Sequence, residues 1–156
     1  MKQPLIPCAD FPENTHASFT SGSKIEQPYD AYSWNHVVHE PSQEPAVIRR
    51  AGQADLPVLI DLLHWLSIDE PPMTLEQAEN VWHQIAGSPI MSVWIVERGG
   101  KAVGTYTLAI LPTLCHVGTP TALVESVVVA PEQRGQQLGE LMMRHACTQA
   151  AAAGCY

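Results

Sequence analysis

Basic residues are scarce in this chain. Eight of its 156 residues are Lys or Arg, against sixteen Asp and Glu, so the formal net charge at pH 7 is −8. Such a surface repels the phosphate backbone of nucleic acids, which argues against general DNA or RNA binding. An anionic small molecule can bind only where the local potential is positive against this overall charge.

Long apolar segments and clustered cysteines are also missing. No stretch approaches the about 18 apolar residues that a membrane-spanning helix needs, and the N-terminus lacks the pattern of a signal peptide. The cysteines, Cys8, Cys115, Cys147 and Cys155, show no C-x-x-C spacing, so neither a disulfide framework nor a metal site is implied. We therefore expect a cytoplasmic protein with reduced thiols, no membrane association and no bound metal.

The first 45 residues differ in composition from the rest. They contain Pro4, Pro7, Pro12, Pro28, Pro41 and Pro45, together with many Ser, Asn and Asp. Because proline removes a backbone donor and disfavours helix, we predict an extended or partly disordered arm over 1–45 and one domain over 46–156. His36 and His39 have a spacing that would suit a metal on a helix, but no third ligand lies near them.

Apolar spacing and turn residues predict the elements of the domain. The expected strands cover 46–49, 90–96, 102–111 and 121–129, and the expected helices cover about 54–66, 75–86 and 135–152. The first helix presents one apolar stripe: Leu56, Leu59, Ile60, Leu63 and Leu66. Thr74 and Gln77 form a capping box for the second helix, which turns Trp82 inward. The Gly99-Gly100 pair predicts a tight hairpin, and the apolar run at 121–129 predicts a strand buried on both faces.

The most informative segment is Leu123–Gly139, which reads LVESVVVAPEQRGQQLG. It predicts a strand, a short turn and the start of a helix. N–H groups at a helix start have no intrahelical partner and lie at the positive end of the helix dipole, which favours phosphate. Gly135 permits close approach of a ligand, and Arg134 adds a positive charge. The alternative is a glycine-flanked helix start that binds nothing.

The pattern V-x-x-P-x-x-R-G-x-x-L-G in this segment resembles the acetyl-CoA motif of the GNAT N-acetyltransferases. That motif has Gln or Arg first, a middle Gly, and a final Gly or Ala. Arg134 fills the first place and Gly139 the last. Gln137 replaces the middle Gly, in a turn similar to the R-G-x-Q-L-G of glucosamine-6-phosphate acetyltransferases. The order of elements from about Val47 to Tyr156 also matches the family.

The resemblance implies an α/β (α+β), GNAT-like fold with a mixed, mainly antiparallel sheet flanked by helices, and with the C-terminal part of the family domain absent. It implies transfer of an acetyl group from the co-substrate acetyl-CoA to a primary amine by direct attack. It also implies the residues that bind the cofactor: backbone groups of Val127, Val128 and Val129 along the pantetheine arm, and Arg134, Gly135, Gln136, Gln137, Leu138 and Gly139 around the pyrophosphate.

Glu125 is the candidate catalytic residue. It places a charge within an apolar strand, and because a buried unpaired carboxylate is costly, we expect it to face a cleft or water. In the family, a Glu near this place deprotonates the amine directly or through water. The alternative is a structural carboxylate paired with Ser126, an Arg or a backbone group. No residue matches the Tyr that serves the family as general acid, so we assign none.

The acceptor is expected to be a small-molecule amine that the sequence does not identify. By resemblance, the acceptor pocket is lined from the region of His64, Trp65, Asp69 and Glu70. Trp65 has a place in the core as its alternative, and a loop residue, His116, either touches the acceptor or is solvated. The negative surface favours a cationic acceptor.

Two other functions stay open beside acetyl transfer. One is a truncated, non-catalytic module that binds CoA or a protein partner. The other, a doubly wound dinucleotide-binding fold, is disfavoured because the Gly-rich turn follows hairpin strands. With the family's next strand missing, residues 121–129 are expected at an open sheet edge. That edge predicts cover by residues 29–38, a homodimer or strand exchange with a second chain, or a longer parent chain.

Overall fold

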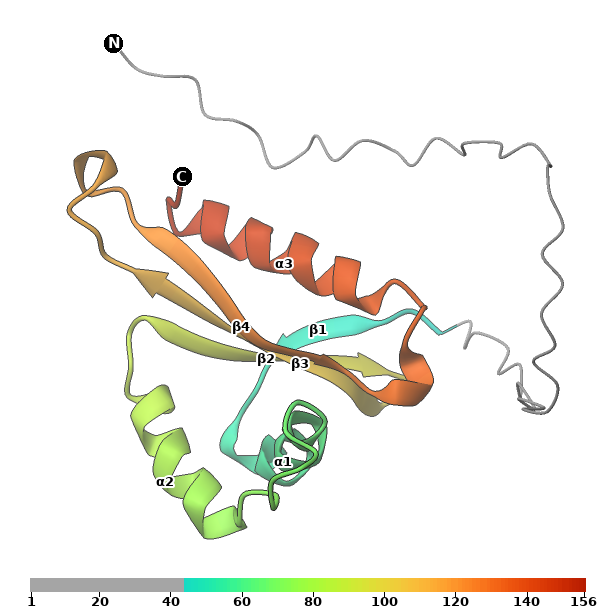
Figure 1. The fold of residues 1–156 in the computed structure, drawn as a ribbon. Helices are drawn as coiled ribbons and strands as arrows, with labels where there is room; N and C mark the ends of the chain where they lie inside the picture. The colour runs from blue at the N-terminus through green and yellow to red at the C-terminus, as the bar shows by residue number, and fades with distance from the viewer. Residues whose placement is uncertain (1–43) are drawn as a thin grey trace, which may run out of the picture. The chain divides into compact units, whose positions relative to one another are not determined.

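The structure, a computed structural model, describes residues 44–156 (Figure 1). The expected N-terminal arm, including the segment 29–38 and the pair His36 and His39, lies almost wholly outside these residues. Those expectations therefore stay predictions, and the elements below all belong to the expected domain.

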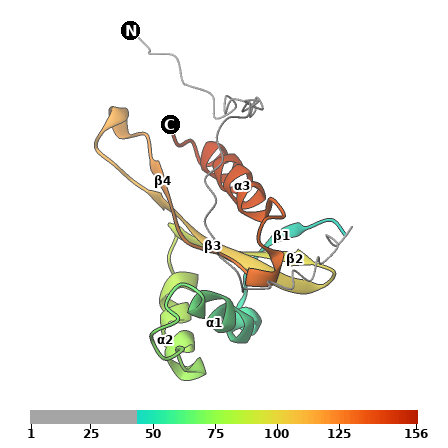
Figure 2. The ribbon, with the colours of Figure 1, turned by 45° about the vertical axis from the view of Figure 1, so that its right-hand side comes forward.

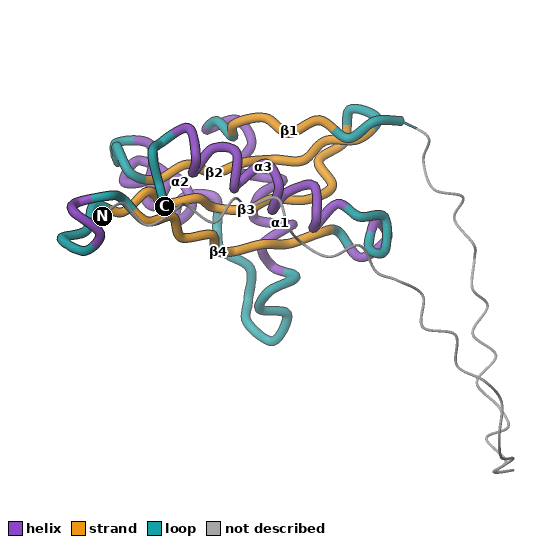
Figure 3. The backbone as a smooth tube through the Cα atoms, turned by 90° about the horizontal axis from the view of Figure 1, so that it is seen from above, coloured by secondary structure: helices purple, strands orange, loops and turns teal. Residues whose placement is uncertain are grey.

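Four strands form one antiparallel sheet in the order β1-β2-β3-β4, which Figure 3 shows side by side. The strands are β1 (Val47–Arg50), β2 (Met91–Arg98), β3 (Lys101–Leu111) and β4 (Thr121–Val129). Each strand pairs with its neighbour in the chain, and every pairing is antiparallel. The β2–β3 hairpin turns at Gly99 and Gly100, whose φ values of 57° and 71° are those that Gly adopts without a steric penalty. The mainly antiparallel sheet and its hairpin are thus confirmed.

Helices cover both faces of this sheet. They are α1 (Leu56–His64), α2 (Leu75–Ala86) and α3 (Leu138–Ala152). Figures 1 and 2 show α1 and α2 on one face and α3 on the other. The result is a layered α/β domain, as expected from the sequence.

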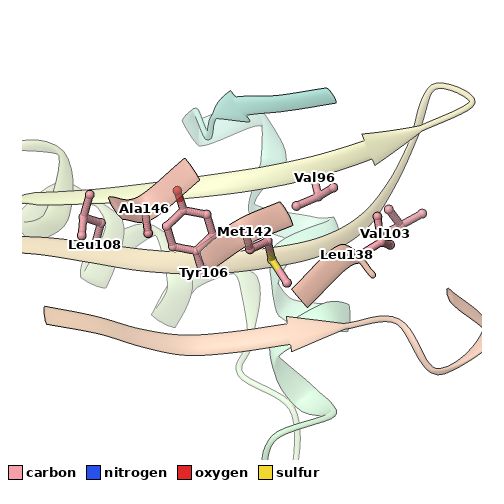
Figure 4. Packing of buried hydrophobic residues seen from close by; sticks show 7 residues of the cluster. All are labelled: Val96, Val103, Tyr106, Leu108, Leu138, Met142 and Ala146. Atoms are coloured by element: carbon pink, nitrogen blue, oxygen red, sulfur yellow. The ribbon is translucent and has the colours of Figure 1, made fainter. Parts of the chain in front are cut away.

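The α3 face of the sheet holds the larger apolar cluster. Leu138, Met142 and Ala146, one helical turn apart, are each 2% exposed or less and pack on Tyr106 of β3 (Figure 4). Close packing of the helix requires Gly104, because a Cβ there would lie 2.9 Å from the Val128 carbonyl oxygen and 3.6 Å from the Met142 sulfur. This cluster fixes α3, and with it the turn that precedes the helix, against the sheet.

The α1 stripe differs in part from the expected one. Leu56 and Leu59 are buried as predicted, and Leu62 is buried as well, at 5% exposure. Leu66 is 51% exposed, because α1 ends at His64 and Leu66 lies beyond the helix. Leu62 instead packs on Val128 of β4, which joins α1 to the strand that carries the candidate base.

The ends of α2 and α3 follow the sequence signals, with one correction. Thr74 Oγ1 accepts the Gln77 N–H at 3.3 Å and Gln77 Oε1 accepts the Thr74 N–H at 2.8 Å, which confirms the capping box. Gly154, at φ 79°, lets the Cys155 N–H reach the Ala150 carbonyl at 3.0 Å and close α3. The start expected at about 135 is three residues too early, because positive φ values in the preceding turn delay the helix.

The prediction that β4 is buried on both faces is wrong. Val128 alone among its residues is buried, and Leu123 and Val127 are 49% and 37% exposed. Within residues 44–156, β4 is an edge strand, so it has a neighbour on one side only. The open edge that the sequence predicted is therefore present in the described sheet, and it borders the candidate site.

Candidate active site

A bulge in β4 determines which side chains reach the site. Thr105 of β3 pairs with Val128, but Thr107 pairs with Glu125, so Tyr106 stands opposite two residues of β4. A regular strand would place residues three apart on opposite faces. The additional residue brings Glu125 and Val128 to the same face, which is the face covered by α1.

The bulge is centred on Ser126, whose φ is 51°. Left-handed backbone is unfavourable for a residue with a side chain, and it occurs at bulges beside active sites. One residue of the pair Ser126–Val127 has no partner in the ladder, so the regular pairing of β4 with β3 is interrupted there. Val127 is also one of the three residues, with Val128 and Val129, to whose backbone the resemblance assigned the pantetheine arm.

A cavity of about 690 Å³ lies on the same face, between α1, α2 and the sheet. Its floor includes Thr105 and Thr107 of β3 and Glu125 and Ser126 of β4. Glu125 is an exposed carboxylate at this cavity, as the sequence predicted for a group that faces a cleft. It is therefore placed to meet a molecule bound in the cavity.

The region expected to line an acceptor pocket does so in part. His64 and Glu70 line the cavity, whereas Trp65, which is 50% exposed, and Asp69 do not. Because α1 ends at His64, the chain turns away at the next residue. The tryptophan at the cavity is Trp82 of α2, to which the sequence gave a core position.

His116 takes no part in this cavity. It lies in the loop between β3 and β4, and its ring contacts the Tyr156 ring with centroids 4.0 Å apart. His116 is exposed and does not line the cavity, so of its two alternatives the structure favours a solvated loop residue.

Two cavity residues escaped the sequence analysis. Thr105 and Thr107 are 1% and 7% exposed, and Thr105 Oγ1 donates to the Trp94 carbonyl at 2.8 Å. Their spacing of two within an apolar strand was the available signal, because it places both hydroxyl groups on one face.

The turn before α3 presents free backbone donors. The first helical bond runs from the Leu141 N–H to the Gln137 carbonyl at 3.0 Å, so the N–H groups of Leu138, Gly139 and Glu140 precede any helical acceptor. The side chain of the N-cap residue Gln137 does not cap them. In the described chain, nothing lies within 4 Å of the point where a Cβ of Gly139 would be. A ligand can therefore approach these donors closely.

Two guanidinium groups border this turn. The exposed Arg134 donates from Nε to the Val129 carbonyl at 3.2 Å, which holds it beside the end of β4. Arg98 of β2 donates to the side-chain carbonyls of Gln133, at 3.3 Å, and Gln136. Its Nε is buried and has no hydrogen-bond partner among the described residues. The sequence missed Arg98 because it lies far away in the chain, in the hairpin.

A polar cluster on the opposite face is separate from the cavity. The Tyr106 hydroxyl lies 2.5 Å from His145 Nδ1, and the Trp94 and His145 rings are in edge contact at 4.6 Å. Burial raises the pKa of Tyr106 to about 12 and lowers the pKa of His145. Tyr106 is fully buried under α3, so it cannot donate a proton to a group in the cavity.

An ion-pair cluster fixes the start of α1, the helix that forms one cavity wall. Arg49 contacts Asp55 and Glu97, in each case with 2.7 Å between nitrogen and oxygen. The hydrogen bond from Arg49 lowers the pKa of the Asp55 carboxyl, and the Gly52 N–H, 2.7 Å from Asp55 Oδ2, acts in the same direction. Arg49 of β1 thus joins Glu97 of β2 to Asp55, the N-cap residue of α1.

No helix within 44–156 is long and apolar enough to cross a bilayer. The same part of the chain contains no group of three or more His, Cys, Asp or Glu side chains arranged to hold a metal ion.

Comparisons with known proteins agree with this geometry. The sequence profile described as the acetyltransferase (GNAT) family matches residues 59–156. Glucosamine 6-phosphate N-acetyltransferase of Trypanosoma brucei brucei is 28% identical over 110 residues, which is 70% of this chain and 74% of that protein.

Solved structures also resemble the chain. A putative acetyltransferase from Agrobacterium tumefaciens str. C58 has 34% identity and a TM-score of 0.67, over 70% of this chain and 76% of that one. A protein from Clostridium acetobutylicum described as a predicted acetyltransferase, solved with acetyl-CoA, shares the fold at 18% identity and a TM-score of 0.58, over 72% and 77% of the two chains. The family profile and these likenesses agree with the strand, turn and helix described above. The chain belongs to the acetyltransferase (GNAT) family and is an N-acetyltransferase.

Proposed function

We propose that the protein transfers an acetyl group from acetyl-CoA to an amine by direct attack, with Glu125 as the general base. The observation that carries this proposal is the β4 bulge. It turns Glu125 toward the cavity, while the same strand leads within a few residues to the free N–H groups before α3.

The cofactor would lie along the edge of β4. The pyrophosphate would bind the N–H groups of the turn Arg134–Gly139, where the helix dipole and Arg134 favour an anion. The pantetheine arm would pair with backbone groups of Val127, Val128 and Val129, as an added strand pairs with an exposed sheet edge. This arrangement carries the thioester toward Glu125.

The reaction removes one proton from the neutral amine and replaces the C–S bond of the thioester with a C–N bond. The amine nitrogen attacks the thioester carbonyl carbon, the C–S bond breaks, and the CoA thiolate leaves. Glu125, exposed to solvent at the cavity, accepts the amine proton directly or through a water. A thiol with the pKa of cysteine, about 8.5, is a competent leaving group as its anion, so the step does not depend on a second side chain.

The test is turnover by the Glu125→Gln variant. Free thiol released from acetyl-CoA in the presence of an amine panel should fall by about 10²–10⁴-fold, while calorimetry shows unchanged CoA affinity. Asp61→Asn is the matched control, because Asp61 is an exposed carboxylate of α1 that does not line the cavity.

Two results would contradict the proposal. Wild-type turnover in Glu125→Gln would return Glu125 to a structural role. Tight CoA binding with no turnover by the wild-type chain on any amine would favour the non-catalytic module.

A further inference from the structure

We infer that the acceptor is an apolar amine that carries no phosphate or carboxylate, and that a phosphorylated amino sugar is a poor substrate. This inference rests on the acetyl transfer proposed above, and it names the substrate class. It is carried by the lining of the cavity at Glu125, which is mostly apolar and, within residues 44–156, receives no Lys or Arg side chain.

Aliphatic and aromatic side chains form most of the cavity wall. Those from the two helices and the loop between them include Ile60, Leu63, Met73, Val81, Trp82 and Ile85. Leu63, Met73 and Val81 are 36%, 48% and 43% exposed, so their apolar surface is open to solvent. An apolar substrate body would cover this surface, which is favourable in proportion to the area removed from water. The hydroxyl groups of a sugar would lose water against the same walls with few polar partners.

Within the described residues, the cavity is lined by two carboxylates and by no Lys or Arg. Its ionisable side chains are His64, Glu70 and Glu125. The Lys and Arg residues of the described chain are Arg49, Arg50, Arg98, Lys101, Arg134 and Arg144, and none of them lines the cavity. A phosphate group placed there would face two carboxylates with no guanidinium or ammonium group from residues 44–156 to bind it.

Four of these Lys and Arg residues are also engaged elsewhere. Arg49 is held by Asp55 and Glu97, and Arg144 pairs with Glu140 on the outer surface of α3. Arg98 and Arg134 border the turn before α3, where the proposed function gives the positive charge to the cofactor. Charge selection therefore differs between the two sites: anions are favoured at the turn and cations in the cavity.

The two carboxylates suit a protonated amine. Glu70 lies in the loop after α1, where it can attract an ammonium group, and Glu125 lies on the sheet, where the proton is removed. Trp82 adds an aromatic surface of the kind on which cations and apolar rings both bind. The Trypanosoma relative, which is named for glucosamine 6-phosphate, is 28% identical to this chain. That likeness leaves room for a different acceptor, because the acceptor is selected by the cavity lining.

The experiment compares kcat/KM for matched acceptors with acetyl-CoA and the full chain. 2-Phenylethylamine and phenylalanine differ by one carboxylate, and glucosamine and glucosamine 6-phosphate differ by one phosphate. We expect 2-phenylethylamine to exceed phenylalanine, and glucosamine to exceed glucosamine 6-phosphate, each by about tenfold or more, with 2-phenylethylamine the best of the four. Glucosamine 6-phosphate as the best substrate would overturn the inference.

A variant tests whether Glu70 contributes to this selectivity between acceptors. Glu70→Lys should narrow the gap between 2-phenylethylamine and phenylalanine by several-fold, mainly through KM, and Asp61→Asn should leave the gap unchanged. Equal gaps in Glu70→Lys and the wild type would overturn the role of this carboxylate.

Binding supplies a readout that does not need turnover. Calorimetry should show 2-phenylethylamine binding more tightly than glucosamine 6-phosphate, and weaker or absent binding of 2-phenylethylamine would overturn the inference. Failure of the proposed function itself would appear differently, as loss of CoA binding or as amine binding without thiol release.

Discussion

Gln137 occupies a backbone position that favours glycine, and the substitution Gln137→Gly should stabilise the protein. This residue is the N-cap of α3 and has φ 60° and ψ 14°, in the left-handed region. It stands where the family motif has its middle Gly, so the turn keeps the glycine conformation without the glycine. The free energy of unfolding should therefore rise when the Cβ is removed.

The magnitude follows from two opposing effects. A residue with a Cβ in left-handed backbone costs about 1–2 kcal/mol. Glycine gives the unfolded chain more freedom, which opposes the gain by about 0.4–1 kcal/mol. The net gain is about 0.5–1 kcal/mol, or a rise of about 2–5 °C in Tm for a domain of this size.

Denaturant unfolding with matched glutamines tests the reasoning. Gln136→Gly, one residue earlier, has no positive φ to relieve and loses the contact with Arg98, so it should destabilise by about 1 kcal/mol. Gln137→Ala keeps the Cβ and should bring no gain. Equal destabilisation by Gln136→Gly and Gln137→Gly would refute the assignment of strain to Gln137.

Two further predictions concern groups that support the site. Arg98→Met should weaken CoA binding several-fold in calorimetry, because the side-chain carbonyls of Gln133 and Gln136 lose the donor that orders the turn. Unchanged affinity would show that the turn keeps its conformation without Arg98. Asp55→Asn should lower the free energy of unfolding by about 1–2 kcal/mol at pH 7, a value reduced for the solvent exposure of Arg49. Because the folded-state pKa of Asp55 is lowered, this stability is present above its unfolded pKa and is lost as pH falls through the folded pKa. Urea unfolding of variant and wild type should therefore converge in acid, and a gap that persists there would contradict the pairing.

Local signals in the sequence predicted much of the fold. The capping box at Thr74, the Gly99-Gly100 turn and the closing Gly154 each depend on residues close in the chain, and the bounds of β4 match the expected ones. The family motif placed the helix start to within three residues, and Glu125 faces the cavity as expected.

The remaining features depend on contacts that leave no local mark. The bulge at Ser126 determines on which face of the sheet Glu125 lies, yet a serine in an apolar strand does not by itself indicate a positive φ. Arg98 reaches Gln133 and Gln136 only through the tertiary fold. Trp82, and not Trp65, lines the cavity because α1 ends at His64. The ends of helices are poorly determined by periodicity.

The most direct test of the account is a calorimetric titration of CoA into the wild-type chain and two arginine variants. Arg134→Ala should weaken CoA binding by about tenfold or more, as expected for loss of one charge-assisted hydrogen bond of about 1.5 kcal/mol. Arg50→Ala removes the same charge from the end of β1, away from the turn, and should bind as the wild type does. Equal CoA affinity in Arg134→Ala and Arg50→Ala would contradict the claim that the turn before α3 holds the cofactor.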